Sequence, residues 1–168
     1  MAASLFVSVR EAAVLRVCRD LIHLRTEKPL QFIDLTELVA ERVRRSGVSE
    51  GMVMVQSRHT TAAVVVNENE PFLLEDFAHL LERWAPEGVP YRHNNLAARE
   101  APLSDEKPNG HAHARALVLG ASVSLNVAEG EIDIGQWQSV FLVELDGPRR
   151  RLVSVQVLGV VTADRGRP

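Results

Sequence analysis

The sequence predicts an α+β domain whose main part is a β-rich antiparallel sandwich with two or three flanking helices. Apolar runs rich in β-branched residues, bounded by turn residues, predict roughly eight short strands. Helical spacing of apolar residues occurs in only two or three segments. The predicted strands are grouped and do not alternate strictly with helices, which favours antiparallel pairing.

The N-terminal part is expected to begin with strands and to continue into a helix. Thr26–Pro29 is a predicted turn between them. Asp34 is expected to be the helix N-cap, with Glu37 completing a capping box, and Gly47 is expected to end the helix. The short strands expected before this helix are Leu5–Val9, Val14–Val17 and Ile22–Leu24.

The middle of the chain is expected to contain two buried strands, a second helix and a long loop. The runs Met52–Val55 and Ala62–Val66 predict strands that are buried on both faces or nearly so. Pro71–Trp84 repeats apolar residues at helical spacing, and Asn69 or Glu70 is expected to cap it. Residues 88–110 predict a long irregular loop, which in a compact domain is often functional.

The C-terminal third is expected to be mainly β. A short helix, His111–Leu119, is predicted to end at Gly120, and turns are predicted near residues 130 and 147. The predicted strands are Ser122–Val127, Glu131–Ile134, Val140–Leu145 and Leu152–Val160. Residues 1–163 are expected to form a single domain and residues 164–168 a flexible tail.

Composition excludes several classes of function. The chain has 168 residues, 46% of them hydrophobic and 24% charged, with a formal net charge of −3. This balance argues against a nucleic-acid binder, which needs a basic face. No apolar run approaches the roughly 20 residues that span a bilayer, and the N-terminus does not resemble a signal peptide, so no membrane partner and a cytoplasmic location are expected. The single cysteine, Cys18, excludes an internal disulfide and is expected to be a buried, inert thiol.

The placement of the histidines indicates a site. Four of the six histidines lie in three polar clusters at the edges of apolar runs. His93 and His113 are the best metal-ligand candidates, since a neutral imidazole is the commonest protein metal ligand. His111 is a weaker candidate, because residues two apart on a helix point in different directions. The His-x-His pattern alone favours a ligand pair and a solvated helix start about equally.

Other polar residues stand beside predicted strands. His59, Thr60 and Thr61 could form an anion-binding or proton-transfer cluster, although taken alone a purely structural role at a strand end is favoured. Asn67 and Glu68 follow the strand Ala62–Val66, where Glu68 could serve as a general base or an oxygen ligand.

Two further segments are ambiguous on pattern alone. Trp137, followed by Gln138, is expected either in the core or in a pocket wall. The basic run Arg149–Arg151 could meet a phosphate, but a solvated turn is favoured. The sequence contains no Gly-rich phosphate loop, dinucleotide fingerprint, cysteine zinc knuckle or nucleophile elbow.

Several strings taken together resemble the YjbQ family, described as secondary thiamine-phosphate synthases. The matching strings, in the family's order, are His59–Ala63 running into Asn67–Asn69, Tyr91–His93, Gly110–His113, Ser122–Val127 with Gly130, Gly135–Gln138, and Asp146–Arg149. One departure is visible, because Gln136 stands where the family usually has Thr. If that hydroxyl contacts a ligand, substrate preference in this chain differs.

The resemblance implies a YjbQ-like β-rich sandwich, assembled as a homotrimer with polar pockets near subunit boundaries. It also implies an activity that joins hydroxymethylpyrimidine diphosphate to thiazole phosphate and releases pyrophosphate, with a small phosphorylated substrate as partner. A divalent metal is expected, zinc first and magnesium as the alternative. The expected catalytic residues are His59, Thr60, Thr61, Asn67 and Glu68, the substrate-binding residues Trp137, Gln138 and Arg149, and the metal ligands His93, His113, His59 and His111.

Two other classes of function remain open on the sequence. A zinc-dependent hydrolase of phosphate esters would use three histidines, an open metal position and Glu68 as base. A non-catalytic trimeric module would bind a small anion at the same histidines without turnover.

Overall fold

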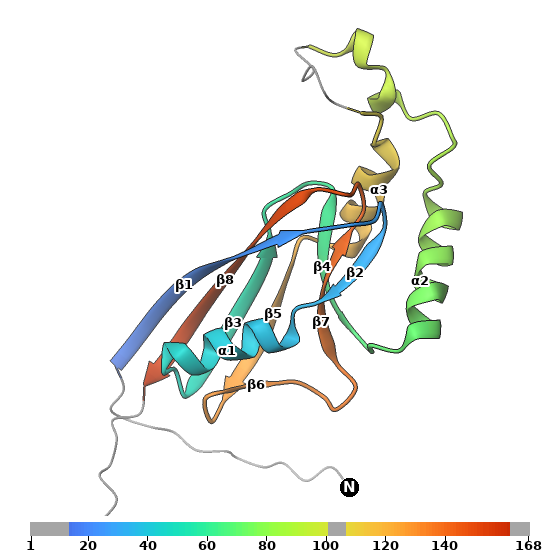
Figure 1. Ribbon diagram of the computed structural model, residues 1–168. Coiled ribbons are helices and arrows are strands. Elements are labelled where there is room, and N and C mark those ends of the chain that lie inside the picture. Colours follow the sequence, from blue (N-terminus) through green and yellow to red (C-terminus); the bar gives the residue numbers. More distant parts are fainter. Residues whose placement is uncertain (1–13, 101–106, 162–168) are drawn as a thin grey trace, which may run out of the picture.

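The computed structural model describes residues 14–100 and 107–161, which form two antiparallel sheets and three α-helices (Figure 1). One sheet has five strands in the order β1-β8-β3-β5-β6, and the other has three in the order β2-β7-β4. The predicted α+β sandwich is therefore confirmed. The strands are β1 (Val14–Arg25), β2 (Gln31–Asp34), β3 (Glu50–Ser57), β4 (Ala62–Asn67), β5 (Ser122–Ala128), β6 (Glu131–Asp133), β7 (Ser139–Glu144) and β8 (Arg150–Val161).

Two of the helices, α2 and α3, cover one face of the three-stranded sheet, and α1 closes the main core. They are α1 (Thr36–Ser46), α2 (Pro71–Trp84) and α3 (Gly110–Leu119), with two short 3₁₀ turns, η1 (Arg92–Asn94) and η2 (Leu96–Ala98), before α3. In Figure 1, α2 runs beside the three-stranded sheet, on the side away from the five-stranded sheet. The predicted helix bounds for α2 are confirmed, and those for α3 differ by one residue.

Strand β7 separates two cores. Its residues Val140 and Leu142 pack into the main core with α1 and the five-stranded sheet. The alternate residues Phe141 and Val143 face the second core, which includes Leu81 of α2. Successive side chains of a strand point to opposite faces, so an uninterrupted apolar run fits a strand with a core on each side.

The N-terminal strand differs from its prediction. Val14–Val17 and Ile22–Leu24 belong to one strand, β1, which pairs with β8 along its whole length. The polar residues between the two runs do not break the strand, because Arg19 and Asp20 are exposed at the edge of the sheet while backbone pairing continues. The predicted strand Leu5–Val9 and the predicted tail 164–168 lie outside the described residues.

The cap of α1 also differs from its prediction. The N-cap is Leu35, not Asp34, and it has no side-chain capping bond. The Asp34 carboxylate accepts a hydrogen bond from the Thr36 amide at 2.8 Å, and Glu37 pairs with Arg44 along the helix, so no capping box forms. For α2 the prediction is confirmed, since Glu70 accepts hydrogen bonds from the first-turn amides.

The register of β4 and β7 defines two ends of the three-stranded sheet. At one end β4 begins and β7 ends, and Ala62 pairs with Glu144. We call this the histidine end, because His59 precedes β4 there. At the other end β4 ends and β7 begins, and Asn67 pairs with Ser139. We call this the tryptophan end, because Trp137 precedes β7 there. At a rise of about 3.3 Å per residue, five steps along β4 place these ends roughly 17 Å apart.

Candidate functional site

A cavity of about 630 Å³ lies at the histidine end. The segment between β3 and β4 contributes His59, Thr60 and Thr61, and α3 with its N-cap contributes His113 and Asn109. The segment between α2 and α3 contributes His93 and Arg99. The turn between β7 and β8, with the start of β8, contributes Asp146, Arg149, Arg150 and Arg151.

The structure therefore places six of the predicted site residues on one cavity, although they come from four separate segments. These are His59, Thr60, Thr61, His93, His113 and Arg149. The rings of His93 and His113 lie edge to face, with their centroids 4.6 Å apart. The lining holds four arginines and one carboxylate, Asp146, so the cavity has an excess of positive charge that suits an anionic ligand.

His59 is neutral, and its Nε2 is engaged by the backbone. Its Nε2 accepts a hydrogen bond from the Leu152 amide at 2.8 Å. Burial lowers the pKa of His59, and the positive charge of Arg151 lowers it further. The neutral ring must then carry its proton on Nδ1, because Nε2 serves as the acceptor. His59 can therefore donate from Nδ1 to a bound anion, while its Nε2 is engaged by the backbone.

His111 points to a different environment. It is 7% exposed and does not line the cavity, although His113 does. Burial lowers the pKa of His111, and the charge of Arg115 lowers it further. Its buried Nδ1 has no hydrogen-bond partner among the described residues. His111 is thus separated from His113, as expected for residues two apart on a helix.

The four predicted metal ligands do not form a metal site within one described chain. Among residues 14–100 and 107–161, no group of three or more His, Cys, Asp or Glu side chains is placed to hold a metal ion. His59 uses Nε2 for the backbone, and His111 lies outside the cavity lining. Among the described residues, only His93 and His113 of the predicted ligands are shown with their rings together, so these residues do not form a three-histidine zinc set.

A buried ion pair that the sequence analysis missed connects to the cavity through Arg151, which lines it, whereas Glu144 does not. Glu144 is fully buried and Arg151 is 3% exposed. The Nε of Arg151 donates to Glu144 at 2.6 Å, and its Nη2 pairs with the other carboxylate oxygen. The same Nη2 donates to the carbonyl and the hydroxyl of Thr61, both at 3.1 Å. Thr26, at the end of β1, donates its hydroxyl to Glu144 at 2.9 Å.

Arg151 belongs to β8 and Thr26 directly follows β1, so both are part of the five-stranded sheet or its edge, whereas Glu144 belongs to β7 of the three-stranded sheet. The network therefore ties the two sheets together at the histidine end. A signal for it was present in the sequence. In β8 the buried positions alternate, and Arg151 occupies the inward position that precedes Val153, Val155 and Val157. A charged residue at an inward strand position indicates a buried partner.

The turn between β7 and β8 is also ordered by hydrogen bonds. Asp146 accepts a bond from the Asn109 amide group at 2.9 Å and pairs with Arg149 at 2.8 Å. The Arg149 Nε donates to the backbone carbonyl of Asp146. Two contacts therefore position Arg149 at the cavity. Arg149 and Arg150 are exposed, as expected for a solvated turn, whereas Arg151 is buried.

Four predicted site residues lie at the tryptophan end and not at the cavity of the same chain. Asn67 and Glu68 follow β4, and Trp137 and Gln138 precede β7. Trp137 is 67% exposed, so it is not a core residue of this chain. Gln138 accepts a hydrogen bond from the Gly135 amide at 2.8 Å and closes the turn. The expectation that Asn67 and Glu68 lie near His59 is wrong for one chain, because β4 runs straight between them.

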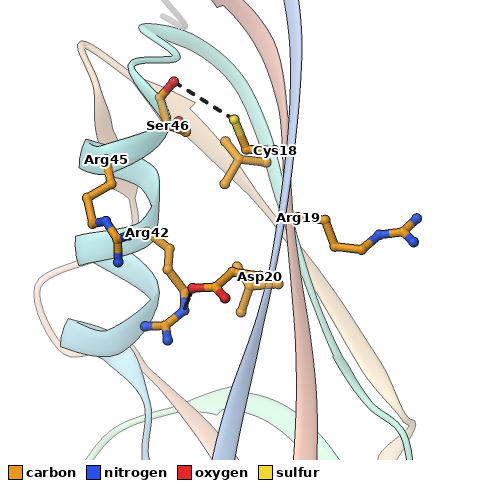
Figure 2. A pocket seen from close by; sticks show the side chains of 8 residues that line it. Cys18, Arg19, Asp20, Arg42, Arg45 and Ser46 are labelled. Carbon is orange, nitrogen blue, oxygen red and sulfur yellow. Dashed lines mark hydrogen bonds and ion pairs between the residues drawn. The ribbon is translucent and has the colours of Figure 1, made fainter.

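A second cavity, of about 260 Å³, lies between β1 and α1 (Figure 2). Arg42 pairs there with Asp20 at 2.9 Å, while Arg19 points to the other side of β1 (Figure 2). Cys18 is half-buried, with its sulfur 4.0 Å from the Ser46 carbonyl. Of its three arginines, Arg42 is neutralised by Asp20 and Arg19 points away, and no histidine lines it, so this cavity is a weaker candidate than the one at the histidine end.

Acid is expected to weaken the fold through Glu144. Burial raises the pKa of this carboxyl, but hydrogen bonds from Arg151 and from the Asp146 amide lower it more, so the net shift is downward. A carboxyl with a lowered folded-state pKa contributes stability that is full above its ordinary value of 4.5 and is lost as the pH falls through the folded value. Urea unfolding between about pH 6 and pH 3 should show this loss, and a Glu144→Gln variant should show a shallower pH dependence. Equal slopes would contradict the assignment.

The fold and the cavity define a β-sandwich protein with a cationic, histidine-lined cavity at one end of its sheets. The chain belongs to the UPF0047 protein YjbQ-like family, whose model matches residues 20–160. It is 40% identical to a UPF0047 protein of Methanothermobacter thermautotrophicus over 81% of this chain and 88% of that protein. It is 30% identical to UPF0047 protein YugU of Bacillus subtilis over 82% of this chain and 97% of that protein.

Solved structures agree with this assignment. A YbjQ-like protein of unknown function from Sulfolobus solfataricus matches with a TM-score of 0.78 and 36% identity, covering 87% of this chain and 99% of that one. A YjbQ/UPF0047 protein from Clostridium acetobutylicum matches with a TM-score of 0.73 and 34% identity, covering 82% and 98% of the two chains. Among the described residues, no helix has the length and apolar character needed to cross a membrane.

Proposed function

We propose that the cavity at the histidine end binds the phosphate or pyrophosphate group of a small substrate. The reaction proposed is the coupling of hydroxymethylpyrimidine diphosphate with thiazole phosphate, which the family resemblance implies. The observation that carries the proposal is the convergence of arginines, threonine hydroxyls and histidines from four segments on one cavity. Arginine and hydroxyl donors are the groups that recognise phosphate oxygens.

In this reaction the bond between the methylene carbon and the diphosphate oxygen breaks, and its electron pair leaves with pyrophosphate. The thiazole nitrogen forms the new bond to the same carbon. Negative charge therefore grows on the leaving oxygen, and donors that face that oxygen lower the barrier. Arg149 and the Nδ1–H of His59 are the residues proposed for this task. A divalent metal, zinc or magnesium, held in part by His93 and His113, would supply further charge neutralisation.

Replacing Arg149 with alanine is expected to weaken the binding of inorganic pyrophosphate by about 10- to 100-fold. A charged hydrogen bond is worth about 1.5–3 kcal/mol, and each 1.4 kcal/mol is tenfold in affinity. The loss is expected at the upper end, because Asp146 would lose its only cationic partner among the described residues, keep its bond from Asn109 and repel the anion. Titration calorimetry measures the effect.

The matched control is Arg19→Ala, since Arg19 is an exposed arginine whose guanidinium bonds Gln156 away from the cavity. Equal affinities of wild type and Arg149→Ala would overturn the site. A coupling assay beside a phosphate-ester assay then separates the functions. Ester turnover without coupling favours the zinc-dependent hydrolase, and binding without any turnover favours the non-catalytic module.

We also propose that the protein assembles as a homotrimer. Helix α2 supports this, because Phe72 is 74% exposed, Leu80 61% and Trp84 50%. Large exposed apolar residues gathered on one helix indicate a protein contact. A ring of three chains joined head to tail could place the tryptophan end of one chain at the histidine end of the next, since heterologous contacts that close form rings.

Mixing two inactive variants is expected to restore coupling activity if sites are shared between chains. Arg149→Ala damages the histidine end and Glu68→Ala the tryptophan end. In hybrid trimers refolded from an equal mixture, each site takes its histidine end from one chain and its tryptophan end from the next. About one quarter of the sites should therefore have both ends intact. Sedimentation measures the trimer mass, and the assay measures recovery. A trimer without recovered activity would contradict shared sites.

A further inference from the structure

A recess of about 420 Å³ adjoins the phosphate-binding cavity. His59, Thr60 and His113 line both spaces, so these three residues form the boundary between them. Beyond these three residues, the recess is lined by four apolar residues, Ala62, Ala116, Leu117 and Ala121, and by Ser57 and the exposed Arg58, so it is more apolar than the cavity. The cationic side chains of the β7–β8 turn line the cavity alone.

We infer that the recess holds the uncharged, ring-sized organic group of the same phosphorylated ligand, with the bond to its phosphate group lying at His59, Thr60 and His113. Ligand sites of about 300–1,000 Å³ combine apolar walls with a few polar groups that fix orientation, and the recess falls within that range. This inference rests on the proposed function, because the phosphate group must occupy the cavity for the organic group to reach the recess.

The shared boundary between the cavity and the recess places His59, Thr60 and His113 beside the bond that joins the phosphate group to the organic group. The cavity holds charge on one side of them, and the recess removes apolar surface from water on the other. The scissile or transferred bond then lies beside the Nδ1–H donor of His59 and the imidazole of His113. A bare anion would fill the cavity without reaching the recess.

Titration calorimetry with inorganic phosphate and phenyl phosphate tests the recess. At about pH 8 both probes are mainly dianions, so they differ chiefly in the ring. The wild-type protein is expected to bind phenyl phosphate about tenfold more tightly than inorganic phosphate, because the ring is buried against alanine and leucine side chains. In Ala121→Phe, whose new side chain occupies the recess, the ratio of the two affinities is expected to fall to about one.

A matched pair on α3 provides the control. Leu117 lines the recess and Val118 does not, although both are exposed apolar residues, at 84% and 61%. Leu117→Ala is expected to lower the affinity ratio by about threefold, and Val118→Ala to leave it unchanged. Ala121 has an exposed side chain, and its carbonyl would keep the bond from the Ser57 amide, so the fold should tolerate the larger residue.

The outcomes separate the recess from the proposed function. Binding of both probes that depends on Arg149, with a wild-type ratio near one, overturns the recess and leaves the phosphate-binding proposal standing. Failure of both probes to bind, or binding that does not depend on Arg149, overturns the proposed function and the recess with it. A tenfold ratio that Ala121→Phe abolishes supports both.

Discussion

Replacing Glu144 with glutamine is expected to lower the free energy of unfolding by about 3–5 kcal/mol, the cost of breaking a buried ion pair by removing one partner. The Glu144 carboxylate accepts hydrogen bonds from Arg151, Thr26 and the amides of Leu145 and Asp146. A glutamine would leave the buried charge of Arg151 uncompensated and would turn an NH₂ group toward donors. Equilibrium urea unfolding of the two proteins measures the difference.

The control for this prediction is Glu75→Gln, which removes the charge of an exposed glutamate on α2 and should change stability by less than about 0.5 kcal/mol. A second variant, Glu144→Gln with Arg151→Met, removes both charges and should recover part of the loss, because apolar replacement of a whole buried pair is often tolerated. A loss below about 1 kcal/mol in Glu144→Gln alone would show that the pair does not organise the histidine end.

Replacing His113 with alanine is expected to reduce turnover by about 10²- to 10³-fold while the fold persists, the range typical of removing one donor that faces developing negative charge. His113 borders both the cavity and the recess, and its ring packs edge to face on His93. Alanine is the best helix former, so α3 should tolerate the change. Rates of coupling, with circular dichroism on the same samples, measure both parts of the prediction.

His79→Ala is the matched control, because His79 is an exposed histidine on α2 and should give wild-type rates. Elemental analysis of the same proteins tests the metal. If a divalent metal is bound, wild type should hold about one ion per chain, and His113→Ala should lose it. Retention of metal in His113→Ala would remove His113 from the ligand set, and wild-type turnover in that variant would show that His113 does not act on the reacting bond.

Much of the fold followed from local patterns. The bounds of α2 were predictable because apolar residues repeat at helical spacing behind a capping glutamate and a proline. The continuity of β1 was not, because Arg19 and Asp20 interrupt its apolar runs and the partner strand β8 lies more than a hundred residues away. The cap of α1 was missed for a similar reason, as Glu37 bonds Arg44 and not the helix start.

By itself the sequence determined the residue types of the site, including histidines, threonines and a basic run at strand edges, and the family strings that order them. Only the tertiary structure decided which of these residues meet. It placed His59, His93, His113 and Arg149 on one cavity, assigned Arg151 to a buried pair with Glu144, and left Asn67, Glu68 and Trp137 at the other end of β4. The physical reason is that spacing along the chain fixes the face of a strand or helix, whereas convergence of distant segments depends on strand register and sheet packing.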